Sequence, residues 1–189
     1  MIPELGHFAL ILALVLSLVQ AVVPLVGARR NSMALMAVGR PAAQGQFFFI
    51  LFSFVCLTWA FITSDFSVQL AASNSHAETP VMYKITGVWG NHEGSLLLWA
   101  MSLSLWTVAV TVFSRHLPDA FLARVLGVLG MVSAGFISFT LVTSNPFERL
   151  LPGVAEGRDL NPLLQDPGMI IHPPLLYMGY VGFSVAFAF

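Results

Sequence analysis

Residues 95–113 read SLLLWAMSLSLWTVAVTVF, a run of nineteen residues without a charged side chain. A helix needs about 20 such residues to cross the hydrocarbon core of a bilayer. Similar runs lie at residues 5–26, 46–64 and 125–143, and a fifth extends from residue 174 to residue 189. These runs predict an all-α fold, a polytopic transmembrane bundle of about five spans that forms one integral membrane domain, residues 1–189.

The composition supports a membrane protein. Apolar residues make up 57% of the chain and charged residues only 9%, whereas soluble domains carry roughly 25% charged residues. The net charge of −1 gives no basic surface for nucleic acid. Cys56 is the single cysteine, so the chain can form no internal disulfide and holds no C-x-x-C-H motif. Because the fifth run contains only sixteen residues, 174–189, we expect the chain to be a fragment of a longer protein.

The distribution of charges predicts the orientation in the membrane. The short connections at residues 27–45 and 114–124 carry five arginines and one acid, whereas the longer loops at residues 65–94 and 144–173 carry most of the acids. Arginine and lysine favour the cytoplasmic side of short loops. We therefore expect a periplasmic N-terminus and two periplasmic loops, at residues 65–94 and 144–173. The spans themselves lack charged residues, which disfavours a proton or ion pump.

The first segment that could carry chemistry is GVWGNHEGS, residues 87–95. Asn91 suits the N-cap of the following helix, because its side-chain oxygen can accept a free backbone N–H. Polar and aromatic residues then recur at helical spacing, at His92, Ser95, Trp99, Ser102 and Trp106. Such a stripe is typical of a packing seam between helices. The alternative is that it forms one wall of a cofactor or substrate pocket.

The second segment is DPGMIIHPPLLYMGY, residues 166–180. Proline disfavours the helical conformation in the residue before it, so Pro173 predicts an extended His172. Pro174 suits the first turn of a helix. His172 would then lie on a stiff hinge at the membrane surface, well placed to bind the metal of a flat cofactor such as heme. The alternative is an interfacial histidine that hydrogen-bonds a neighbouring loop.

These segments resemble the CcmF family of bacterial cytochrome c-type biogenesis proteins. The resemblance lies in residues 87–99, in residues 166–182 and in the start of the chain, residues 1–7. It implies a heme lyase of the inner membrane that receives heme from the chaperone CcmE on the periplasmic side. The enzyme would attach the heme vinyl groups to the C-x-x-C-H thiols of an apocytochrome c, presented by CcmH and CcmI. Family members also hold a structural heme b in the membrane.

The resemblance assigns one residue of this chain to the heme iron. His172 matches the first periplasmic histidine of the family, an axial ligand to the incoming heme. Trp89, His92, Trp99 and Tyr177 are candidates for lining a pocket around it. The second periplasmic histidine, the heme b ligands and the tryptophan-rich heme-contacting segment have no counterpart here. We therefore assign no catalytic residue and expect this fragment alone to be inactive.

Three alternatives remain open at the level of the sequence. A homologue of the NrfE type, which serves nitrite reductase maturation, would carry the same motifs. A membrane transporter or heme exporter would need a polar pathway across the bilayer. A structural membrane subunit would need only the packing features. The sequence does not identify the client cytochrome.

Overall fold

The computed structural model describes all 189 residues and is almost entirely helical. Its helices are, in chain order, α1 (Ile2–Arg30), α2 (Met33–Ala37), α3 (Gly39–Ile62), α4 (Gln69–Asn74), α5 (Val81–Gly87), α6 (His92–Phe113), α7 (Asp119–Thr143), the 3-10 helix η1 (Pro162–Gln165) and α8 (Pro167–Ala188). A single isolated bridge pairs Val68 with Arg149. Five helices are long and apolar enough to cross a membrane, which confirms the predicted all-α bundle.

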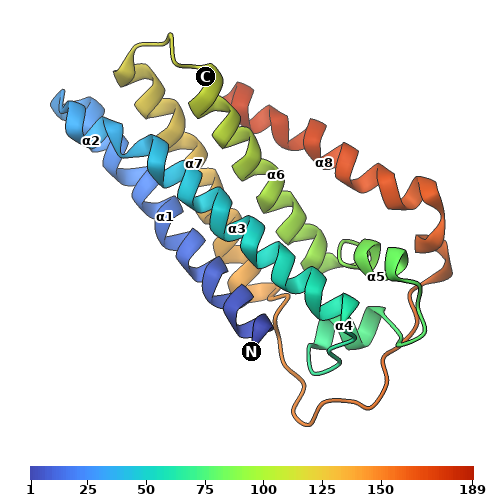
Figure 1. Ribbon diagram of the computed structural model, residues 1–189. Coiled ribbons are helices and arrows are strands. Elements are labelled where there is room, and N and C mark those ends of the chain that lie inside the picture. Colours follow the sequence, from blue (N-terminus) through green and yellow to red (C-terminus); the bar gives the residue numbers. More distant parts are fainter.

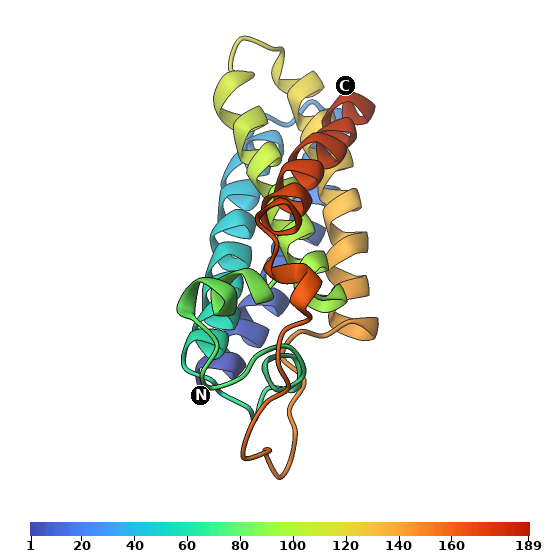
Figure 2. The same ribbon diagram turned by 90° about the vertical axis from the view of Figure 1, so that its right-hand side faces the viewer.

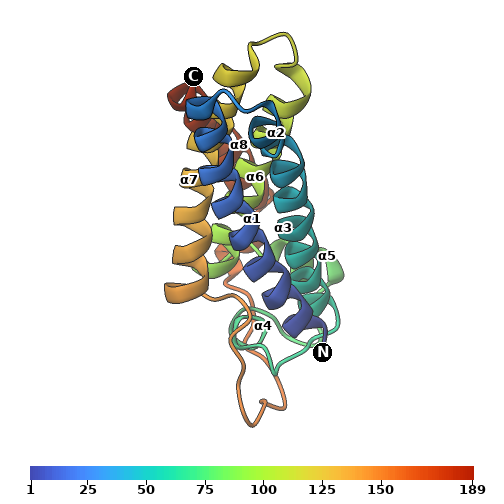
Figure 3. The same ribbon diagram turned by 90° about the vertical axis from the view of Figure 1, so that its left-hand side faces the viewer.

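The long helices lie side by side in one bundle (Figure 1). Helix α1 packs between α3 and α7, as Figure 3 shows, and α6 packs against α3, α7 and α8. The largest apolar cluster, which includes Leu10, Leu57, Leu97 and Ile137, joins α1, α3, α6 and α7. Helix α8 lies on the outside of the bundle (Figure 2) and has only one buried residue, Val181. The bundle is thus four well-packed helices with a fifth laid against α6 and α7.

Close approach between α1 and α7 depends on a glycine. A Cβ atom added at Gly130 would lie 2.7 Å from the backbone nitrogen of Ala21, which is closer than real Cβ contacts allow. Small residues at such positions let helix backbones approach in a membrane, where packing rather than water exclusion drives association. Gly130 therefore sets the distance between these two helices.

The two ends of the bundle differ in charge. One end, here called the loop end, holds the N-terminus, α4, α5 and residues 144–166 (Figure 1). The opposite end, here called the arginine end, holds Arg29, Arg30, Arg40, Arg115 and Arg124. Its one acid is Asp119, whereas the other eight acids belong to the loop end. The chain therefore presents a basic face at one membrane surface and an acidic face at the other.

Ion pairs and a buried lysine hold the loop end together. Lys84 is buried, and its Nζ donates hydrogen bonds to Ser64 Oγ at 2.7 Å and to the Ala77 carbonyl at 2.9 Å. Arg149 pairs with Glu4 at 3.0 Å and with Asp65 at 3.4 Å. These contacts connect α1, the end of α3 and α5 with the long segment that leads to α8.

The helix bounds differ from the apolar runs. Helix α7 begins at Asp119 rather than near residue 125, and α3 begins at Gly39 rather than at residue 46. The predicted loop 65–94 contains α4 and α5. Hydropathy detects only the part of a helix that lies in lipid, whereas hydrogen bonding continues into the polar residues at each end. Helix α8 likewise begins seven residues early, at Pro167 instead of near residue 174.

Candidate functional site

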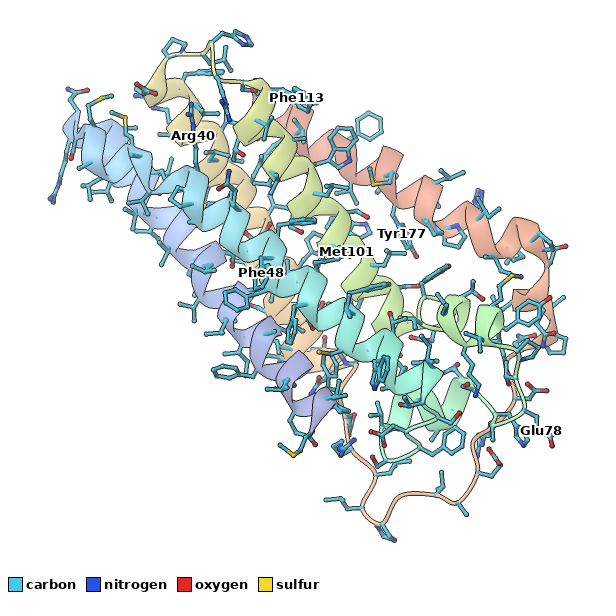
Figure 4. The ribbon with its side chains drawn as sticks, in the orientation of Figure 1. Arg40, Phe48, Glu78, Met101, Phe113 and Tyr177 are labelled. Carbon is cyan, nitrogen blue, oxygen red and sulfur yellow. The ribbon has the colours of Figure 1, made fainter.

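A cavity of about 400 Å³ opens at the loop end, between the start of α6 and the start of α8. Three of the residues expected to line a pocket, Trp89, His92 and Tyr177, lie in its wall. Figure 4 shows Tyr177 between α8 and α6. The other lining residues are Thr86, Gly90, Asn91, Ser95, Leu164, Met169, Ile170 and Pro173. The cavity thus brings together the two segments that the sequence singled out.

Asn91 builds the wall of the cavity on the α6 side. Its Oδ1 accepts a hydrogen bond from the Gly94 backbone N–H at 2.7 Å, as expected for an N-cap. Its Nδ2 donates to the carbonyls of Gly87 at 2.8 Å and Val88 at 3.1 Å. A Cβ at Gly94 would lie 1.6 Å from the Val88 carbonyl oxygen. The turn therefore tolerates no side chain at residue 94, and one amide fixes its shape.

His92 and Trp89 are held by contacts within the chain. His92 Nε2 lies 3.0 Å from Ser144 Oγ, which follows the last residue of α7. Trp89 Nε1 donates to the Ile170 carbonyl of α8 at 3.0 Å. The sequence did not reveal either partner. Its one signal was Pro174, which lacks the N–H that would otherwise donate to the Ile170 carbonyl. His92 thus joins α6 to α7, and Trp89 joins the same turn to α8.

Trp99 lies elsewhere. Its ring packs on Phe136 of α7, with the ring centroids 3.6 Å apart and the planes tilted by 31°. Ser102, one turn further along α6, is buried and donates to the Leu98 carbonyl. The structure therefore places Trp99 in the packing seam between α6 and α7, outside the cavity.

The expectation that His172 is extended is wrong, because His172 lies inside α8. Asp166 caps this helix: its Oδ1 accepts hydrogen bonds from the backbone N–H groups of Gly168 at 2.8 Å and Met169 at 3.2 Å. Pro167 then occupies the first turn, where a missing N–H costs nothing. The cap starts the helix one and a half turns before His172, and this overrides the local preference that Pro173 imposes.

The imidazole of His172 is exposed and does not line the cavity. Leu175, Leu176 and Gly179 follow His172 at spacings of three, four and seven residues, which places them on the same face of α8. Leu175 is 66% exposed and Leu176 is 48% exposed. A Cβ at Gly179 would meet no atom within 4 Å. This face, here called the His172 face, offers an imidazole beside an open apolar surface.

The chain does not build a metal site of its own. No group of three or more histidine, cysteine, aspartate or glutamate side chains is arranged to hold a metal ion. A single imidazole binds iron firmly only when other ligands already hold the metal, as the four nitrogens of a porphyrin do in heme. The arrangement at His172 therefore suits a metal that arrives within a flat, largely apolar ligand.

Comparison with known proteins identifies relatives of the whole chain. The family described as Cytochrome C assembly protein matches residues 89–189. The cytochrome c-type biogenesis protein CcmF of Pseudomonas aeruginosa is 64% identical over 190 residues, and CcmF of Escherichia coli is 54% identical over 190 residues. Each match covers 100% of this chain and 29% of the relative. The chain thus spans about 29% of the length of these relatives.

Two further similarities bear on the fold and on the type of homologue. The cytochrome c-type biogenesis protein NrfE of Haemophilus influenzae is 44% identical, over 100% of this chain and 30% of the relative. A solved structure, the cytochrome c heme lyase CcmF, superposes with a TM-score of 0.85 at 27% identity. It covers 100% of this chain and 29% of that protein. The bundle described above is therefore the fold of the corresponding part of that heme lyase.

Proposed function

The chain belongs to the cytochrome c assembly protein family, and on that premise we propose that it handles heme during cytochrome c maturation, with His172 as an axial ligand to the heme iron. The observation that carries the proposal is the exposed imidazole on an apolar face of α8. A neutral imidazole is a common axial ligand to heme iron. The nearby leucines would contact the porphyrin, and Gly179 would leave space for it.

The substrate heme would lie against the His172 face rather than inside the cavity. His172 is not a cavity residue, whereas its neighbour Pro173 is. Trp89 instead donates a hydrogen bond to α8 from the bundle side, and Tyr177 of α8 packs against the core of the bundle. On this proposal the cavity wall holds the helix in place, and the opposite, exposed face receives the ligand.

The proposed orientation places the loop end in the periplasm of a bacterial cell and the arginine end in the cytoplasm. The five arginines at the arginine end support it, because basic residues favour the cytoplasmic side of the membrane. The chaperone CcmE would deliver heme at the loop end, and CcmH and CcmI would present the apocytochrome there. A second iron ligand would come from residues that this chain does not contain.

The proposed reaction is addition of two cysteine thiols to the two heme vinyl groups. Each sulfur bonds to one vinyl carbon and each thiol proton ends on the other, so no oxidant is consumed. The histidine of the C-x-x-C-H motif would replace His172 on the iron, and the product would then be held less firmly. The role of this chain is to hold and orient the substrate, and none of its residues is assigned to the bond-forming step.

A heme b within the membrane does not fit the residues of this chain. Such a heme needs ligands near the middle of the spanning helices. The five histidines lie in connections or within two turns of a helix end, at His7, His76, His92, His116 and His172. If the complete protein holds a heme b, its ligands lie in other helices.

The test compares absorption spectra of the complete protein, purified from heme-replete membranes, with those of His172→Ala. We expect the substrate-heme signal to be lost and any heme b signal to remain. His116→Ala is the matched control, because His116 lies at the arginine end and should retain both signals. An unchanged spectrum for His172→Ala would contradict the proposal and favour a scaffold or heme-exporter role.

A further inference from the structure

Helix α8 is held to the bundle by side-chain packing and by two hydrogen bonds to its backbone. Val181 is buried, and Tyr177, Val185 and Ala188 pack against the core of α6 and α7. Two tryptophans donate indole N–H groups to its carbonyls: Trp89 Nε1 to Ile170 at 3.0 Å, and Trp106 Nε1 to Met178 at 2.9 Å. We call these two residues the indole clamp.

The first contact compensates for a proline. In a regular helix the N–H of residue 174 would donate to the carbonyl of residue 170. Pro174 has no N–H, so the Ile170 carbonyl lacks its helical donor. An unsatisfied carbonyl is costly near lipid. Trp89 supplies the missing hydrogen bond from the turn that precedes α6.

The second contact lies beside a glycine. The Met178 carbonyl lies one turn before Gly182, whose backbone faces the indole of Trp106. A Cβ at Gly182 would lie 3.7 Å from the nearest atom of that ring. A methyl group there would make an ordinary van der Waals contact, so the approach of α8 to the indole does not require a glycine.

The two contacts together restrict rotation. Ile170 and Met178 are eight residues apart, which places their carbonyls roughly two turns apart along α8 and about 80° apart around its axis. One contact would act as a pivot, whereas two contacts at different heights and angles oppose both rotation and tilting. His172 lies between them in the sequence. Rotation of α8 by one residue position would move its imidazole by about 100° around the axis.

We propose that Trp89 and Trp106 are positioning residues that set the rotation of α8 and thereby the direction in which His172 meets the heme iron. The importance of that direction rests on the proposed function. The clamp itself rests on the two indole contacts and on Pro174. The aromatic residues of the α6 stripe therefore have two different roles: Trp99 packs against α7, whereas Trp106 holds α8.

The experiment uses the complete protein with Trp89→Phe, Trp106→Phe and Trp59→Phe. Phenylalanine keeps an aromatic ring but removes the indole donor. Trp59 is the matched control, because it is 50% exposed on α3 and lies outside the clamp. We expect Trp89→Phe and Trp106→Phe to change the low-spin electron paramagnetic resonance signal of the ferric heme, which reports the axial ligands. Trp59→Phe should leave it unchanged.

A second measurement does not depend on heme. In a protein that carries H172C, a membrane-impermeant maleimide should modify position 172 at a rate that depends on the rotation of α8. The same protein without H172C provides the background, and Cys56 is buried. We expect Trp89→Phe to change this rate by about fivefold, the effect of one ordinary hydrogen bond. The amount of protein in membranes serves as the control for folding.

Pro174→Ala tests the mechanism of the Trp89 contact. The new backbone N–H can donate to the Ile170 carbonyl, so Trp89→Phe should have a smaller effect in that background. Unchanged maleimide rates and spectra in both Trp89→Phe and Trp106→Phe would overturn the proposal. If H172A keeps its full heme signal while Trp89→Phe still changes the maleimide rate, the clamp is supported and the heme-ligand proposal fails.

Discussion

Asn91 shows how one side chain can organise a functional region. It satisfies an N–H at the start of α6 and two carbonyls at the end of α5. Its neighbours in the chain, Trp89 and His92, then contact α8 and the end of α7, respectively. Loss of this one amide would therefore disturb contacts to two other helices.

Asn91→Ala should destabilise the protein by about 1–2 kcal/mol, the usual cost of losing an N-cap. Thermal unfolding of detergent-solubilised protein measures the effect. Asn161→Ala is the matched control, because Asn161 caps only the short, exposed η1 through Leu163 N–H. Equal unfolding temperatures for the two variants would contradict the role given to Asn91.

Helix packing in this bundle depends on where side chains are absent. The backbone of α1 leaves no room for a Cβ at Gly130, whereas α7 carries a second glycine, Gly135, whose Cβ would meet no atom within 4 Å. The two glycines lie five residues apart on one helix and have opposite surroundings. They offer a direct test of helix packing against helix propensity.

Gly130→Ala should destabilise the bundle by about 1–3 kcal/mol, because the new methyl group forces α1 and α7 apart. Gly135→Ala should be neutral or stabilise by about 0.5–1 kcal/mol, since alanine has the higher helix propensity. Chemical or thermal unfolding in one detergent compares the two variants. The packing argument fails if Gly130→Ala is as stable as Gly135→Ala.

At the scale of the whole molecule, charged side chains hold one end of the bundle, the loop end, together. Burial raises the pKa of Asp65, but hydrogen bonds from the Ser67 hydroxyl and backbone, together with the charge of Arg149, outweigh it and lower that pKa overall. The pKa of Glu156 is also lowered, mainly by the backbone N–H groups of Ala77 and Gly157. The folded state therefore favours the ionised form of both side chains.

These lowered pKa values predict the direction of a pH effect. A carboxyl group whose folded pKa is below its unfolded value stabilises the fold above the unfolded pKa, about 3.9 for Asp. That contribution is lost as the pH falls through the folded pKa. Hydrogen–deuterium exchange at residues 63–68 and 145–152, corrected for intrinsic rates, should stay constant from about pH 5 to 8 and increase below about pH 4.

Asp65→Asn provides the control. The amide cannot ionise, so the same segments should exchange faster at neutral pH and should respond less to acid. A variant that exchanges like the unchanged protein at every pH would show that the pair with Arg149 does not hold the loop end.

The tertiary structure decided much of what concerns the site. The membrane spans and the Asn91 cap could be predicted, because each depends on residues close in the sequence. The position of His172 within α8 was not, because the Asp166 cap competes with the preference imposed by Pro173 and only the folded chain reveals which prevails. Trp99 and Trp106 belong to one stripe, yet they contact different helices, and no local pattern distinguishes them.

The sequence by itself determined that this protein is a multi-helix membrane bundle, because the thickness of a bilayer dictates the length and apolarity of each span. Its resemblance to a family was carried by the motifs at residues 87–99 and 166–182. Only the tertiary structure decided which helices are neighbours. That choice sets the cavity, the exposure of His172 and the indole contacts to α8, since each depends on groups far apart in the chain that meet only when the helices pack.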